Sequence, residues 1–253
     1  PLGRKAGGIL YFKKGMLEDA VEELTFASEK IKGDAELHHY LGKAYYELDK
    51  LKDAVTEFLA AVSFYRPDKT VEKAEAYSDL GLAYKNLKAS SESFAAYKES
   101  LALNPLKADT NYYLGILSYE KGRLDESAAF LEKAVSLDSK DTDAHFMLGV
   151  VYDKKNLPEN AEVEFKQAIS LNKNDAEAHN YLGMLYYRRG DFEKSISEHQ
   201  LAVQCNKNYP EAFNNLGIAL YAKGDLKDAA DAFKKALTLL PSFVEAHYNL
   251  GLV

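Results

Sequence analysis

Apolar and small residues recur along the chain with a period of 34 residues. A Leu-Gly pair marks each period, and its glycines are Gly42, Gly81, Gly115, Gly149, Gly183, Gly217 and Gly251. Gly8 lies one period before Gly42, and only the interval from Gly42 to Gly81 is longer, at 39 residues. A fixed period of this length is typical of a stack of repeated units, none of which buries its apolar face alone.

Within each period the small and large positions predict two helices that pack closely. When the marker glycine is counted as place 8, places 20 and 27 hold only alanine or serine in the seven full periods, and place 24 is larger. The place-24 residues are Leu24, Phe58, Tyr97, Leu131, Phe165, His199 and Phe233. Small residues let two helices approach, and large residues fill the space between layers.

Turn-forming residues separate the two predicted helices. Residues suited to a left-handed helix end stand there in five periods: Gly15, Gly122, Asn156, Gly190 and Gly224. Pro158 and Pro210 fall where helices are expected to start, and a missing N–H does no harm at that position. The second period is five residues longer, and its Pro67 cannot continue a helix. Asp68 or Thr70 can cap a new helix, which is therefore expected to be about one turn longer than its counterparts.

This helix–turn–helix pattern resembles the tetratricopeptide repeat over essentially the whole chain. Places 7, 8, 11, 20, 24, 27 and 32 carry the family signature. Place 11 holds Tyr11, Tyr45, Tyr84, Tyr152 and Tyr186, and place 32 holds Pro105 and Pro241. The resemblance implies an all-α fold, a right-handed superhelical solenoid of antiparallel helix pairs.

The resemblance also implies where each repeat begins and ends. The expected repeats are 1–34, 35–73 with the five-residue extension, 74–107, 108–141, 142–175, 176–209 and 210–243, followed by the start of an eighth at 244–253. The first repeat is expected to be cut at its N-terminus, because the sequence PLGRK at 1–5 resembles a protease-cleavage scar.

Four histidines follow an acidic residue by two places, and a histidine near a carboxylate could serve as a general base or a metal ligand. They are His38, His145, His179 and His247, and all four stand at place 4. Residues two apart on a helix point about 200° apart, so each acid and histidine cannot converge on one ion. We interpret the histidines as packing residues and predict no catalytic, cofactor or metal site. These acids belong to a column that is acidic in every repeat after the first and is expected in the first turns of helices, where negative charge stabilises unpaired N–H groups. The column is Glu36, Glu75, Asp109, Asp143, Glu177, Glu211 and Glu245.

Composition narrows the class of partner and the compartment. The net charge is −7 and the basic residues are scattered, so no nucleic acid partner is expected. Cys205 is the only cysteine and is interpreted as a small buried hydrophobe; it fits a reducing compartment and favours the cytoplasm. The periplasm stays open if a signal peptide has been removed. No stretch approaches the ~20 apolar residues of a membrane span.

A partner-binding groove is predicted on the first helices. In tetratricopeptide proteins, places 2, 5, 9 and 12 tend to face a concave groove; here place 9 is apolar except for Lys43. The predicted groove residues are Tyr112, Ile116, Tyr119, Phe146, Val150, Asn180, Met184, Tyr187, Asn214, Ile218 and Tyr221. Such a trough suits an amphipathic helix or an extended apolar segment, with Asn180 and Asn214 holding backbone groups. The alternative is that neighbouring repeats bury part of this stripe.

The resemblance implies a non-catalytic scaffold that binds a peptide or helix of a partner protein. One alternative is the substrate-recruiting arm of a larger enzyme, such as a glycosyltransferase. Another is a pilotin-like or self-assembling protein of a bacterial envelope or organelle complex. The long junction before Asp79-Leu80-Gly81-Leu82 is similar to that of type IV pilus pilotins. End-to-end self-association would use the apolar faces at the two ends of the array.

Overall fold

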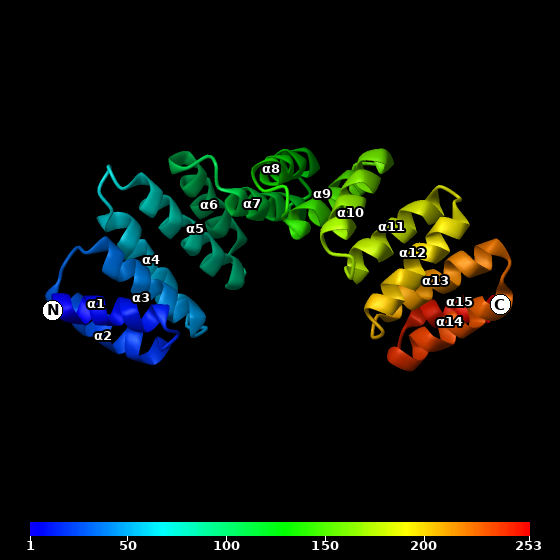
Figure 1. Ribbon diagram of the computed structural model, residues 1–253, viewed down its shortest axis with the longest axis horizontal. Coiled ribbons are helices and arrows are strands. Elements are labelled where there is room, and N and C mark those ends of the chain that lie inside the picture. Colours follow the sequence, from blue (N-terminus) through cyan, green and yellow to red (C-terminus); the bar gives the residue numbers. More distant parts are fainter. The chain divides into compact units, whose positions relative to one another are not determined.

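The chain folds into α-helices alone. The computed structural model describes all residues, 1–253, and contains 15 α-helices and no strand (Figure 1). The helices form two compact units, Pro1–Lys121 and Gly122–Val253, which we describe separately. The predicted all-α class is confirmed.

Unit 1 is a stack of helix pairs. Its helices are α1 (Leu2–Lys13), α2 (Leu17–Lys30), α3 (Ala35–Glu47), α4 (Leu51–Phe64), α5 (Thr70–Asn86), α6 (Ser90–Leu103) and α7 (Ala108–Glu120). Each helix packs against the one before it and the one after it within the unit. Because short turns join successive helices, the chain reverses direction at each turn and the pairs are antiparallel.

Unit 2 repeats the same arrangement. Its helices are α8 (Leu124–Leu137), α9 (Thr142–Lys154), α10 (Pro158–Leu171), α11 (Ala176–Arg188), α12 (Phe192–Cys205), α13 (Pro210–Lys223), α14 (Leu226–Leu239) and α15 (Val244–Gly251). Successive helices again pack side by side. In both units the first helix of a pair carries the places expected to face the groove.

Within each unit, the marker glycine and the large residue at place 24 hold the two helices of a pair together. A Cβ atom built on Gly149 would lie 2.7 Å from Phe165 Cδ1, and one built on Gly217 would lie 2.5 Å from Phe233 Cε1. Both rings are fully buried. Since real Cβ atoms do not approach carbon so closely, only glycine lets the ring of the second helix lie on the backbone of the first.

The turns between the two helices of a repeat contain the predicted left-handed residues, and two further residues at such turns share this conformation. The five residues expected at left-handed helix ends all have positive φ, which confirms that prediction: Gly15, Gly122, Asn156, Gly190 and Gly224. Asp49 and Lys88 also have positive φ, at 57° and 59°. Aspartate is enriched in this conformation among non-glycine residues, whereas lysine is not. Pro158 and Pro210 are the first residues of α10 and α13, as expected.

The long second period gives a long helix. The helix α4 ends at Phe64, before Pro67, and α5 has 17 residues where α3 and α7 have 13 each. The capping prediction was wrong, because Lys69 occupies the cap of α5 and its side chain makes no capping hydrogen bond. Asp68 instead pairs with Arg66.

The side-chain caps that the structure does show come from aspartates at the end of the preceding period. Asp34, Asp141 and Asp175 accept hydrogen bonds from backbone N–H groups of α3, α9 and α11. Because α5 begins earlier than expected, one acid that was predicted in a first turn lies further along its helix. Glu75 lies inside α5, and Glu72 occupies its first turn. The other acids of that column, from Glu36 onward, stand in first turns as expected.

Candidate functional site

The predicted groove residues lie on first helices in both units. Unit 1 holds Tyr112, Ile116 and Tyr119 on α7, all half-buried. Unit 2 holds Phe146 and Val150 on α9, Asn180, Met184 and Tyr187 on α11, and Asn214, Ile218 and Tyr221 on α13. Their spacing of three or four residues places each helix's members along one face.

A hollow in unit 2 brings three of these residues together. Met184 and Tyr187 from α11 and Ile218 from α13 line it, with the His199 ring beneath and Arg188 and Asn215 at its edge. The hollow has a volume of about 170 Å³, enough for one side chain of a ligand. Its wall is mostly apolar, and the nearby Tyr221 ring is exposed. Such a surface can bury apolar side chains of a partner.

Three other predicted groove residues are buried by the array itself. Val150, Asn180 and Asn214 are each no more than 5 % exposed. The Asn180 Nδ2 donates to the Tyr209 hydroxyl at 3.3 Å, and its Oδ1 accepts from Asn215 Nδ2 at 3.1 Å. The Asn214 Oδ1 accepts from Asn249 Nδ2 at 3.0 Å. These two amides therefore join successive first helices, and their expected contact with backbone groups of a partner stays a prediction.

The asparagine pairs belong to a recurring contact between repeats. In each case a place-5 side chain meets the place-6 side chain of the next repeat. The pairs are His39 with Asp79, Phe146 with Tyr181, Asn180 with Asn215, and Asn214 with Asn249. The chemistry changes from charged to aromatic to amide while the position stays fixed. Place 5 therefore links neighbouring repeats along the first-helix face.

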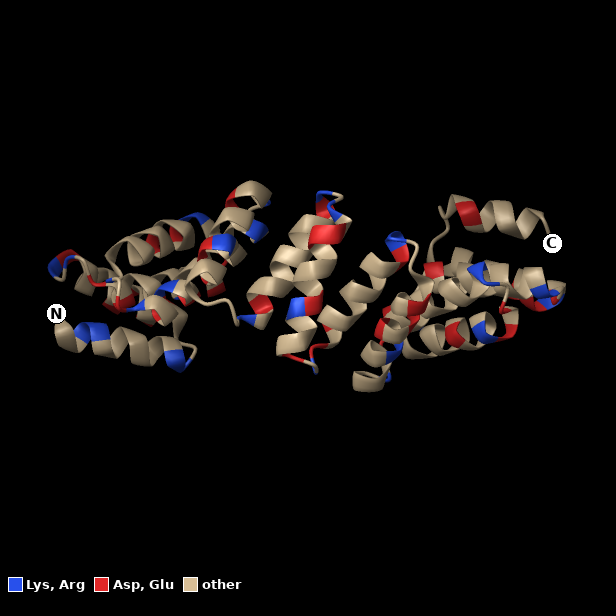
Figure 2. Ribbon diagram, turned by 90° about the horizontal axis from the view of Figure 1, so that it is seen from above, with Lys and Arg blue, Asp and Glu red and all other residues tan.

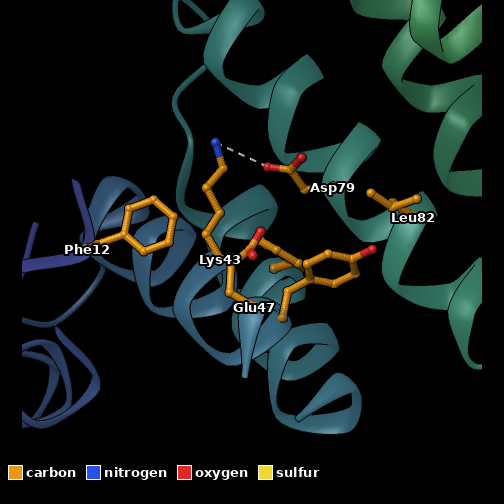
Figure 3. Close-up of a pocket in the computed structure, with 7 residues that line it drawn as sticks. Phe12, Lys43, Glu47, Asp79 and Leu82 are labelled. Atoms are coloured by element: carbon orange, nitrogen blue, oxygen red, sulfur yellow. Dashed lines mark ion pairs between the residues drawn. The ribbon is translucent and has the colours of Figure 1, made fainter. Parts of the chain in front are cut away.

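A second pocket, in unit 1, was missed by the sequence prediction. It is lined by Phe12 from α1, by Lys43, Tyr46 and Glu47 from α3, and by Asp79 and Leu82 from α5, with the Phe58 ring as its floor. Figure 3 shows Lys43 reaching across the pocket toward Asp79, with their ion pair at 3.3 Å. The available signal was Lys43, the one interruption of the apolar place-9 column.

A hydrogen-bonded chain supports this pocket. The His39 Nε2 donates to Asp79 Oδ2 at 2.8 Å, and the Tyr65 hydroxyl lies 3.2 Å from His39 Nδ1. Because a carboxylate only accepts, the proton of this bond is on Nε2, and Nδ1 of the neutral form of the ring accepts from the Tyr65 hydroxyl. Burial opposes ionisation of Asp79, but the His39 hydrogen bond and the Lys43 charge together hold the pKa of that carboxyl below its usual value. Burial raises the pKa of Tyr65, as do Glu36, Glu72 and Glu75.

Three of the four place-4 histidines bond to glutamates nineteen residues later, not to the acids two places before, and His247 bonds to the Pro241 carbonyl. His38, His145 and His179 each place Nδ1 2.6 Å from a glutamate oxygen, of Glu57, Glu164 and Glu198 respectively. His179 Nε2 also lies 3.3 Å from a backbone carbonyl. The Glu198 hydrogen bond raises the pKa of His179 despite burial. These contacts join the two helices of one repeat, and no group of three or more metal-ligating side chains forms.

The cysteine and the surface charges complete the description of the first-helix face and its surroundings. Cys205 is half-buried, so it is less enclosed than the sequence predicted. Figure 2 shows basic residues scattered among acidic ones along both units. No helix is both long and apolar enough to cross a membrane. The arrangement offers pockets, exposed aromatic rings and ion pairs, which are the elements of a binding surface.

Comparison with known proteins agrees with the helix-pair architecture. Three tetratricopeptide repeat models match residues 79–144, 142–175 and 174–242. No curated protein sequence matches the chain.

Solved structures share the fold over most of the chain. The C-terminal part of a TPR repeat-containing protein from Cytophaga hutchinsonii is 17% identical, covers 97% of this chain and 99% of its own, and superposes with a TM-score of 0.77. YrrB, described as a TPR protein with an unusual peptide-binding site, is 24% identical over 76% of this chain and 96% of its own, with a TM-score of 0.64. MamA is 27% identical over 71% of this chain and 97% of its own, with a TM-score of 0.61. The chain belongs to the tetratricopeptide repeat family.

Proposed function

We propose that this chain is a non-catalytic scaffold that binds a peptide or helical segment of a partner protein on its first helices. Tetratricopeptide arrays typically act as scaffolds for other proteins. YrrB, which shares the fold, is described as having a peptide-binding site. The observation that carries the proposal is the apolar hollow of unit 2, where Met184, Tyr187 and Ile218 meet.

The proposed contact surface in unit 2 consists of the accessible members of the predicted set. These are Phe146, Met184, Tyr187, Ile218 and Tyr221, while Val150, Asn180 and Asn214 support them from below. In unit 1 the α7 residues Tyr112, Ile116 and Tyr119 form a separate candidate surface. Aromatic rings bury a large area at a small cost in side-chain entropy, so they suit an apolar ligand segment.

The test uses a peptide that is selected from a random library of twelve-residue peptides for binding to the full chain. Its affinity is then measured by fluorescence anisotropy for the wild type and for Ile218→Asp. Burying an unpaired carboxylate against an apolar ligand is unfavourable, so we expect binding at least about tenfold weaker. Tyr187→Ser, which removes a ring without adding charge, should act in the same direction.

Val163→Asp is the matched control for this experiment. Val163 is an exposed apolar residue of α10, the second helix of its repeat. Its replacement by aspartate makes the same chemical change, from an apolar side chain to a carboxylate, away from the hollow. The control should bind the peptide as the wild type does, and circular dichroism should show unchanged helicity in every variant. Unchanged affinity in both Ile218→Asp and Tyr187→Ser would refute binding at the hollow.

A further inference from the structure

The pocket of unit 1 differs chemically from the hollow of unit 2. It has a volume of about 300 Å³ and combines apolar and aromatic walls, from Phe12, Tyr46 and Leu82, with two carboxylates. In Figure 3 the Phe12 ring lies on one side of the pocket and Leu82 on the other, with Glu47 between them. A ligand side chain entering here would contact an aromatic ring and a carboxylate at the same time.

The carboxylates of this pocket are not balanced by cations. Asp79 Oδ2 receives both the His39 hydrogen bond at 2.8 Å and the Lys43 ion pair at 3.3 Å, so Oδ1 has no partner. The Glu47 carboxylate is exposed and makes no hydrogen bond or ion pair. Two carboxylates therefore face the single ammonium group of Lys43. Burial raises the pKa of Tyr46, and Glu47 and Asp79 raise it further, as expected where the local potential is negative.

The adjoining surface has the same sign of charge. A polar pocket that shares Lys43 is lined by Glu36, Glu72 and Glu75, and Lys69 is its only other lysine or arginine. Glu36 is paired with Lys5 of α1 at 2.8 Å. Lys69 is paired with Glu72 at 3.0 Å. Glu75 is exposed and has no such partner. The first-helix face of α3 and α5 therefore favours a positively charged ligand.

We propose that the unit 1 pocket binds an arginine side chain of a partner protein. A guanidinium group is planar, stacks on aromatic rings and donates several hydrogen bonds from one plane. Stacked against Phe12 or Tyr46, it can donate to Glu47 and to Asp79 Oδ1. A lysine ammonium group is more strongly hydrated and lacks a planar face, so it fits these walls less well. This site is independent of the segment-binding hollow in unit 2.

The test is an NMR titration of the isotopically labelled full chain with N-acetyl-arginine methylamide. N-acetyl-citrulline methylamide is the comparison probe, because citrulline has nearly the same shape without the charge. The arginine probe should shift amide signals of α1, α3 and α5 around the pocket and reach saturation. Because charge-assisted hydrogen bonds are about twice as strong as neutral ones, the citrulline probe should bind at least about tenfold more weakly.

Variants then locate the charge that is recognised. Glu47→Gln preserves shape and should weaken arginine binding roughly fivefold or more by removing one charge-assisted bond. Glu18→Gln, on the exposed start of α2, makes the same change in net charge and should have no effect. Asp79→Asn is less suitable, because it also alters the His39 hydrogen bond.

Several outcomes would overturn the assignment. Equal binding of arginine and citrulline, or equal effects of the two glutamine variants, would show that the carboxylate of Glu47 is not recognised. Equal binding of N-acetyl-lysine methylamide would reject selectivity for a guanidinium group. Saturable shifts of the same signals by N-acetyl-glutamate methylamide would show an anion site at Lys43 instead. No shift with arginine would reject the pocket as a binding site.

Discussion

His199 is a histidine at a place where other repeats have phenylalanine, tyrosine or leucine. Its ring lies on the backbone of Gly183, and its Nδ1 is buried without a hydrogen-bond partner. Burial lowers the pKa of His199 to about 4, from 6.5. Below about pH 6.5 the unfolded chain therefore binds a proton at this residue, whereas the folded chain does so only as the pH approaches 4. The free energy of unfolding must fall as the pH drops from about 6.5 toward 4.

Replacement of His199 by phenylalanine should remove this sensitivity to acid. Phe165 and Phe233 occupy the same place against their glycines, so the ring fits. Between pH 7 and pH 4.5 the free energy of unfolding of the wild type should fall by roughly 2–3 kcal/mol more than that of His199→Phe. Urea unfolding at both pH values measures the difference. His247→Phe, at an exposed histidine, is the control, and parallel pH dependence in wild type and His199→Phe would contradict the prediction.

The hydrogen-bond partners of the place-4 histidines show which parts of a residue's structural role can be predicted from the sequence and which cannot. The interpretation of the place-4 histidines as structural followed from helix geometry, because residues two apart point in different directions. Their actual partners, such as Glu198 for His179, lie on the second helix of the same repeat. Whether a given glutamate on that helix faces the histidine depends on how the two helices are rotated about their axes. Residue spacing alone does not specify that rotation.

At the scale of the helices, the close approach at the marker glycine is the strictest requirement of the fold. A Cβ atom on Gly8 of α1 would lie 2.6 Å from Leu24 Cγ of α2. One on the adjacent Gly7 would have no atom within 4 Å. The two glycines are neighbours in one helix and differ in whether a partner helix lies against them. They therefore separate the packing role of glycine from its low helix propensity.

The pair Gly7→Ala and Gly8→Ala tests this requirement. Gly7→Ala should stabilise α1 by up to about 1 kcal/mol, because alanine is the better helix former. Gly8→Ala gains the same propensity but forces Leu24 away, and should destabilise by about 1–3 kcal/mol. Urea unfolding gives the overall change, and hydrogen exchange of the α1 amides gives the local change. Similar effects of the two substitutions would show that the approach to Leu24 imposes no strain.

Helices were predictable to a greater extent than their ends. The repeated small residues, Pro67 and the turn glycines were sufficient to predict helix pairs and the longer α5. The cap of α5 was not predictable, because Asp68 and Thr70 both have suitable side chains and the turn geometry selects neither. Asp49 and Lys88 adopt left-handed conformations because the turns at the ends of α3 and α5 require them. Aspartate takes up this conformation more readily than most residues, whereas lysine does not.

At the scale of the whole molecule, a uniform repeat carries two pockets of different chemistry. The sequence predicted an apolar groove, and part of it gathers in unit 2. The unit 1 pocket proposed to bind arginine depends on contacts between repeats, such as His39 with Asp79, which lie 40 residues apart. The five-residue extension offsets this pair from the 35-residue spacing of Asn180 with Asn215. A strict period therefore does not reveal it, and the pairing becomes evident only when the helices are packed.

The difference in chemistry predicts a difference in salt dependence between the two sites. Raising the salt concentration from 50 to 500 mM shortens the Debye length from about 14 to about 4 Å, so attraction between partly exposed charges is strongly screened. Arginine binding in unit 1 should weaken several-fold, whereas an apolar peptide bound at Met184, Tyr187 and Ile218 should bind equally well or better. Titrations of each probe at both salt concentrations measure this. Glu47→Gln should reduce the salt dependence of arginine binding and leave peptide binding unchanged. Ile218→Asp should weaken peptide binding and leave arginine binding unchanged. A common salt dependence for the two probes would contradict the existence of two chemically separate sites.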